Sequence, residues 1–83
     1  MEIYSQVSEE EIELEYKKIS QNIKKIRKSK KITQEELALT MGFTTATFYT
    51  NAENIKNGKH FNLEHIIKIS KILDTEMCEF FKN

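Results

Sequence analysis

The chain has 83 residues with no proline, two glycines and one cysteine, which suits one small domain and excludes an internal disulfide. Without a long apolar run or a basic, apolar leader, we expect a cytoplasmic protein that does not contact a membrane. The formal net charge is zero, but residues 1–15 carry six acids and no base, whereas residues 17–31 carry eight bases and no acid. An acidic arm on a basic body does not exclude nucleic acid as a partner.

The first expected helix is long and amphipathic. Ser8 and Glu11 have the spacing of a capping box at a helix start. Apolar residues then recur at alternating intervals of four and three, at Ile12, Tyr16, Ile19, Ile23 and Ile26. This stripe predicts a helix that runs to about Ser29, either unbroken or divided near Ser20 to leave a separate N-terminal helix.

Four shorter helices are expected after the first. Thr33 and Asn62 are caps for the second and the fourth, and Gly42 can take the positive φ that ends the second. The remaining two are expected over residues 44–54 and 75–81. We therefore predict an all-α, five-helix domain over residues 19–83, with residues 1–18 as an acidic N-terminal arm or helical extension.

The second and third helices, joined by a glycine turn, have the layout of a helix-turn-helix. Such a unit presents its second helix to the major groove, where hydroxyls bond base edges and methyl groups touch thymine. The residues expected to contact bases are Thr44, Thr45, Ala46, Tyr49 and Thr50. Packing of Tyr49 inside the domain is an equal alternative. This edge lacks Arg, Lys and Gln, so DNA shape and backbone contacts are expected to supplement direct readout.

Two runs carry a family resemblance, IKKIRKSKKITQEELALTMGFTTATF at 23–48 and NGKHFNLEHIIKISKILDTEMCEFF at 57–81. Over residues 19–81 the chain resembles the phage-repressor, Cro-like helix-turn-helix DNA-binding family. The resemblance implies that Gln34 reaches a phosphate and braces the recognition helix. It also implies phosphate contacts from the loop and the start of the fourth helix, at Asn57, Gly58, Lys59 and Asn62. The basic residues closest to the second helix, Lys30 and Lys31, are added to this phosphate set.

Three departures from the family pattern affect these assignments. Arg27 matches an arginine that usually pairs with a glutamate just before the Asn-Gly turn, but Lys56 stands there. Arg27 is therefore expected to pair with another acid, such as Glu53, or to contact phosphate. The connection from Phe48 to the Asn-Gly turn is longer than the common pattern. Lys31 takes a position where glycine is frequent, which implies some strain at that helix end.

The favoured function is a sequence-specific transcriptional regulator, a repressor or autoregulator, that reads a short, palindromic operator. No nucleophile–base pair, metal-ligand set or phosphate-binding glycine loop is present, so no enzyme, metal, cofactor or small-molecule ligand is expected. The expected partners are double-stranded DNA and a second copy of the chain, because one unit reads only a few base pairs. Alternatives are a controller of a restriction system, an antitoxin, or a protein-interaction module that has lost DNA binding. The acidic arm is open to three readings: a disordered tail, a helix packed on the domain, or part of a dimer interface.

Overall fold

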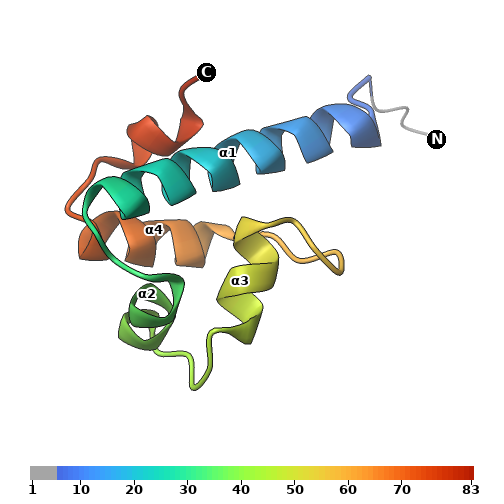
Figure 1. Ribbon diagram of the computed structural model, residues 1–83. Coiled ribbons are helices and arrows are strands. Elements are labelled where there is room, and N and C mark those ends of the chain that lie inside the picture. The colour runs from blue at the N-terminus through green and yellow to red at the C-terminus, as the bar shows by residue number, and fades with distance from the viewer. Residues whose placement is uncertain (1–5) are drawn as a thin grey trace.

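The computed structural model describes residues 6–83, which form helices joined by turns (Figure 1). The elements are the α-helices α1 (Glu9–Ser29), α2 (Gln34–Met41), α3 (Thr47–Glu53) and α4 (Leu63–Ile72), and the 3₁₀ helix η1 (Met77–Phe81). The all-α prediction is confirmed, but the count of five α-helices is wrong. The last segment has only five residues, and it is held by an i→i+3 bond from the Glu79 N–H to the Glu76 carbonyl.

Helix α1 is continuous through Ser20, so the alternative of a separate N-terminal helix is wrong. Ser20 is buried there, and its hydroxyl donates to the Ala52 carbonyl at 3.1 Å, so it joins α1 to α3. The N-terminal half of α1 extends beyond the other helices (Figure 1), which accounts for a longest dimension of 47 Å. Ile12 and Leu14 on this extension are exposed, so the apolar stripe enters the core only further along the helix.

One core joins all the elements. Its buried side chains come from every helix and from the segments next to α4. They are Ile23, Leu37, Ala38, Met41, Tyr49, Ala52, Phe61, Ile66, Ile69, Leu73 and Phe80. Helix α1 packs against α3 and η1, and α2 packs against α3 and α4. Because α2 packs on α4, α3 packs on α1, and the two helices pack on each other, their relative orientation is fixed by the same core that stabilises the fold.

The four α-helices end in the same way. A residue at the C-cap (Gly42 in α2) or directly after it has a positive φ, and two backbone bonds close a Schellman motif. At α2, for example, the Phe43 N–H donates to the Ala38 carbonyl and the Gly42 N–H to the Leu39 carbonyl. The positive-φ residues are Lys31, Gly42, Ile55 and Asp74. Only one of these is glycine, so three helix ends hold a side chain in the left-handed region.

Among residues 6–83, no helix combines the length and the apolar character that crossing a membrane requires.

Candidate nucleic-acid interface

The α2–α3 unit presents its turn at one tip of the molecule. Gly42, with a φ of 105°, ends α2 and reverses the chain. Behind the turn, the Phe43 and Phe48 rings lie 5.2 Å apart, and the Phe48 ring is 4.9 Å from the His65 ring of α4. In Figure 1 this turn is the lowest point of the molecule, at the opposite end from α1. The turn is therefore supported on its inner side by these aromatic rings, and its outer side faces solvent.

Helix α3 begins at Thr47 and not at residue 44. Thr45 accepts a bond from the Thr47 N–H at 3.4 Å, a local contact that favours a turn over a further helical turn. Thr44 and Thr45 are thus exposed turn residues directly ahead of the helix, and Ala46, its N-cap, is half-buried. These three predicted base contacts lie together at the exposed tip.

Sequence reasoning missed two residues on the open side of α3. Thr47 is exposed and Asn51, one turn further along, is half-buried. Asparagine can bond adenine through two atoms, so Asn51 carries the chemistry that the threonines lack. Tyr49 and Ala52 are both wholly buried and form the inner face of α3. Their i, i+3 spacing is visible in the sequence and could have placed Thr47 and Asn51 on the outer face.

Tyr49 is a correction to the predicted base contacts. Its side chain is 0% exposed, and its ring packs 5.2 Å from the Phe61 ring. The phenol donates a short hydrogen bond to the Glu53 carboxylate. A buried phenol with its donor already engaged cannot reach a base edge, so Tyr49 is a core residue of α3.

Glu53 is the centre of a buried polar network. Its carboxylate accepts two bonds from Arg27, from Nε and Nη2 at 3.0 Å each, and one from Gln34 Nε2 at 2.9 Å. With the bond from Tyr49, four donors converge on one carboxylate. Arg27 Nη1 donates in addition to the Ile32 carbonyl at 2.7 Å. The expectation that Arg27 finds Glu53 in place of the usual acid is therefore confirmed.

The network keeps its charges at neutral pH. Burial alone would raise the pKa of Glu53, but hydrogen bonds from Arg27, Tyr49 and Gln34 outweigh burial and lower it. Burial would likewise lower the pKa of Arg27, and the bond to Glu53 turns the change into a rise. For Tyr49, burial and the bond to Glu53 both raise the pKa, so the phenol keeps its proton and remains a donor. Helices α1, α2 and α3 are thereby joined through fully paired polar groups.

Gln34 connects the network to the outer side of α3. Its amide nitrogen donates to Glu53, and its amide oxygen accepts a bond from the Thr50 hydroxyl at 3.1 Å. The predicted bracing of the recognition helix by Gln34 is confirmed. Thr50 is half-buried with its hydroxyl engaged, so it offers its methyl group more readily than its oxygen.

The loop after α3 carries the residues predicted to grip the DNA backbone. Asn57 and Gly58 both have positive φ, and the Lys59 N–H donates to the Lys56 carbonyl at 3.0 Å, as in a type I′ turn. All four residues of this turn are exposed. Two exposed lysines and a tight Asn-Gly turn suit an anion, so the loop retains the chemistry assigned to it.

Asn62 is exposed but already engaged in capping α4. Its side-chain oxygen accepts from the His65 N–H at 2.8 Å, and its own N–H donates to His65 Nδ1 at 3.1 Å. Burial lowers the pKa of His65, which favours the neutral ring that this bond requires. Any phosphate contact at this end of α4 would thus come from the remaining first-turn amides.

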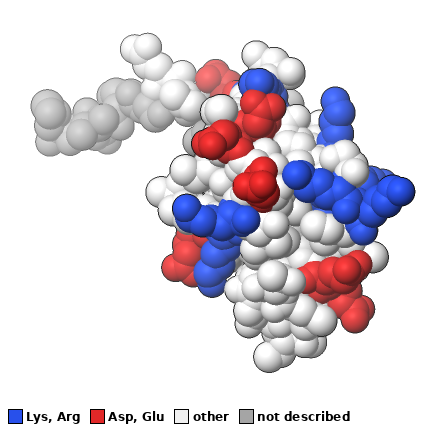
Figure 2. Space-filling view, turned by 90° about the vertical axis from the view of Figure 1, so that its left-hand side faces the viewer, with Lys and Arg blue, Asp and Glu red and all other residues white. Residues whose placement is uncertain are grey.

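Charge surrounds the recognition tip without covering it. Residues 37–52 contain no charged side chain, whereas Lys30 and Lys31 are exposed just before α2. Figure 2 shows basic side chains gathered at mid-height, while the lower end, which holds the α2–α3 turn in Figure 1, is almost free of Lys and Arg. Figure 2 also shows acidic side chains between the basic ones and this lower end. An uncharged reading edge with lysines further back is suited to base contacts flanked by phosphate contacts.

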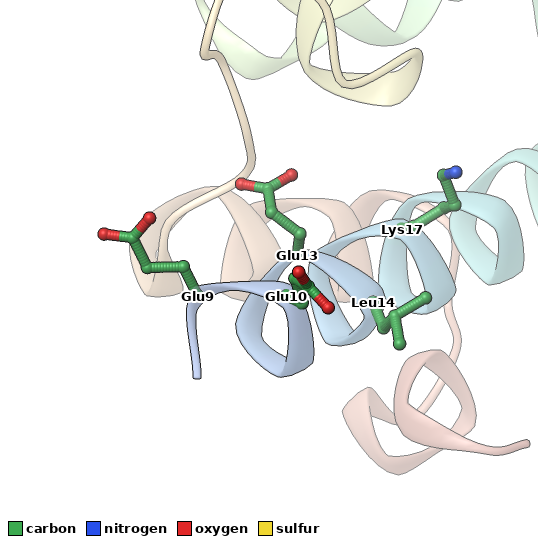
Figure 3. Close-up of a pocket in the computed structure, with 5 residues that line it drawn as sticks. All are labelled: Glu9, Glu10, Glu13, Leu14 and Lys17. Atoms are coloured by element: carbon green, nitrogen blue, oxygen red, sulfur yellow. The ribbon is translucent and has the colours of Figure 1, made fainter. Parts of the chain in front are cut away.

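A shallow hollow lies elsewhere, on the N-terminal half of α1. Glu9, Glu10, Glu13, Leu14 and Lys17 line it, and all five side chains come from one helix (Figure 3). Small-molecule sites are enclosed by groups that converge from several elements, which this open helix face lacks. The hollow instead marks the acidic surface of the extension.

The model of the helix-turn-helix family matches residues 23–80. The match includes α2, α3, α4 and the end of α1, and it leaves out the N-terminal half of α1. No curated protein matches the chain.

Proposed function

The chain belongs to the helix-turn-helix family of the Cro and C1 type, and on that premise we propose that it is a sequence-specific transcriptional regulator, a repressor or autoregulator. The observation that carries the proposal is the exposed, uncharged edge of Thr44, Thr45 and Thr47 at the tip of a braced helix pair. Hydroxyl and methyl groups at such an edge can bond base edges and touch thymine methyls.

We assign base contacts and backbone contacts to separate surfaces. Thr44, Thr45, Ala46 and Thr50 remain the proposed base readers, joined by Thr47 and Asn51. The proposed phosphate contacts are Lys30, Lys31, Gln34, Asn57, Gly58, Lys59 and Asn62. Base readers without Arg or Lys supply limited affinity, so the lysines supply most of the binding energy and the threonine edge supplies the discrimination.

The proposal includes a homodimer in the cytoplasm, acting on a palindromic operator. One recognition helix reads only a few base pairs, and two half-sites about one DNA turn apart multiply affinity and specificity. A restriction controller and an antitoxin use the same DNA-binding chemistry and are variants of this proposal.

The exposed apolar residues of the α1 extension favour a second candidate, a protein-interaction module without DNA binding. Ile12 and Leu14 are both exposed beside five glutamates of residues 9–15. A titration of binding to random duplex against salt separates the two. For a DNA reader the logarithm of affinity falls linearly with the logarithm of salt concentration, whereas an interaction module binds no duplex even at low salt.

Selection of bound sequences from a random DNA pool tests specificity. A palindromic motif is expected, and a pool that stays random would contradict sequence-specific reading. In follow-up variants, Thr45→Ala should reduce discrimination among related operators by about three- to tenfold. Lys59→Ala should weaken all duplexes alike, and equal losses for both variants on every duplex would contradict the division between readers and backbone contacts.

A further inference from the structure

The N-terminal extension of α1 contacts the loop between α3 and α4 through Tyr16. The Tyr16 ring stacks on the His60 ring with centroids 3.9 Å apart and planes 11° from parallel. Both residues are half-buried. Tyr16 lies outside residues 23–80, the part of the chain that matches the family model. The contact therefore joins a part of α1 outside the family match to the loop that carries Lys56 and Lys59.

The two ends of this loop are anchored differently. At the start, the Schellman motif of α3 fixes Lys56, whose N–H donates to the Asn51 carbonyl at 2.8 Å. At the far end Phe61 is buried against the Tyr49 ring. Between these anchors the turn at residues 56–59 is exposed, and His60 is the residue that follows it directly. The C-terminal end of the turn is not fixed by the Schellman motif of α3. A restraint on His60 therefore acts at this end.

We propose that Tyr16 is a positioning residue for DNA backbone binding, which acts by stacking on His60 and holding the Asn57-Gly58-Lys59 turn in its binding shape. The proposal rests on the proposed function and adds a role for the α1 extension within it. Tyr16 itself touches no phosphate. The stack restrains the loop before DNA binds, so the loop loses less conformational entropy on binding. Affinity is thereby raised without an added contact to the nucleic acid.

The contact needs an aromatic ring and not a hydroxyl. Tyr16→Phe keeps the stacking face and removes only the oxygen, whereas Tyr16→Ala removes the ring. Tyr16 lies on the projecting half of α1, ahead of Ile19, where the helix begins to pack on the core. The alanine variant is therefore expected to fold, which circular dichroism checks.

The first measurement uses the full chain without DNA. Hydrogen exchange at the Lys59 amide, which bonds to the Lys56 carbonyl, reports the closed turn. We expect Tyr16→Ala to accelerate this exchange about threefold and Tyr16→Phe to leave it unchanged. The Gly42 amide, which bonds to the Leu39 carbonyl at the α2 end over the same three-residue span, is the matched control and should not respond in either variant.

The second measurement uses random and selected duplexes at fixed salt. Tyr16→Ala should weaken both by a similar factor of about three and leave discrimination between them intact. His60→Ala should have the same effect, and the double variant should be no weaker than either single one, because both remove one contact. Additive losses, an unchanged Lys59 amide in Tyr16→Ala, or unchanged duplex affinity would each overturn the positioning role. If the unmodified chain binds no duplex, the proposed function itself fails, whatever the exchange data show.

Discussion

At the scale of single residues, Glu53 determines how the recognition helix is held. Four donors from α1, α2 and α3 converge on its carboxylate, which is buried with Arg27. Removing one partner of a buried charge pair leaves the other without compensation, which typically costs about 3–5 kcal/mol. We therefore expect Glu53→Ala to lower the free energy of unfolding by roughly that amount in urea denaturation. Glu76→Ala, at an exposed position, is the control and should change it little.

The same carboxylate gives the fold an acid limit. The pKa of Glu53 is lowered in the folded chain from its usual 4.5, because bonds from Arg27, Tyr49 and Gln34 outweigh the effect of burial. Its contribution to stability is therefore fully present above the unfolded value and is lost as the pH falls through the folded value. Below pH 4.5 the unfolding free energy should fall more steeply for the unmodified chain than for Glu53→Gln. Parallel profiles would show that another group governs acid unfolding.

The contacts of a single residue can be predicted from sequence when that residue requires a charged partner. They cannot be predicted when the residue suits both the core and the surface. Arg27 needs an acid once Lys56 replaces the usual glutamate, and Glu53 is the acid within reach. Tyr49 instead could serve either face of α3, because a tyrosine suits a groove as well as a core that supplies an acceptor. The acceptor was Glu53, and its position became evident only from the packing of three helices.

At the scale of elements, helix ends are where the chain departs most from an ideal sequence. Lys31 holds a φ of 60° after α1, in the position that glycine usually takes. Relief of this strain predicts that Lys31→Gly raises the unfolding free energy by about 1 kcal/mol. Asp74→Gly after α4 should gain less, because aspartate tolerates the left-handed region better than lysine does. Thermal unfolding of both variants measures the difference, and equal gains would contradict strain at Lys31.

The start of α4 depends on the protonation of His65. The ring accepts the Asn62 N–H at Nδ1, so only a ring unprotonated at that atom completes the capping box. Burial chiefly lowers the pKa of His65 from 6.5, so its contribution is present above that value and is lost as the pH falls below it. Thermal stability should thus decline below pH 6.5 by less than about 1 kcal/mol.

His65→Gln is the matched variant for this prediction, since glutamine is a usual acceptor at this position of a capping box and does not titrate. Its stability should change little across the same pH range. A decline of equal size in His65→Gln would assign the effect to another group.

Element boundaries were predictable where local chemistry fixes them. The caps Ser8, Thr33 and Asn62 were all identified from sequence, because a capping side chain bonds backbone only three residues away. The start of α3 was placed three residues too early, since Ala46 provides no side-chain cap to mark it. The 3₁₀ type of the last helix could not be inferred either. This helix contacts α1 and α4 and places Phe80 in the core, and such long-range packing is not evident from the local sequence.

At the scale of the whole molecule, the net charge is zero, but acidic and basic residues are concentrated in different parts of the chain. The acidic extension of α1 projects away from the α2–α3 tip (Figure 1), so it does not shield the reading edge. The glutamates can nevertheless act on bound DNA through their electric field. Interactions between exposed charges extend over a Debye length of about 10 Å at 0.1 M salt and about 30 Å at 0.01 M. At low salt the extension should therefore repel the phosphate backbone that the lysines attract.

The variant Glu10→Gln/Glu13→Gln tests this repulsion on the open face of the extension (Figure 3). Removing two negative charges should raise affinity for random duplex by about two- to fivefold near 0.02 M salt, and the gain should vanish above about 0.2 M as screening shortens the reach of the field. The control Glu10→Asp/Glu13→Asp keeps both charges and should bind as the unmodified chain does. A gain that persists at high salt would mean that the glutamates act through a contact or through folding and not through their field. No gain at low salt would place the glutamates of the extension beyond the electrostatic reach of DNA.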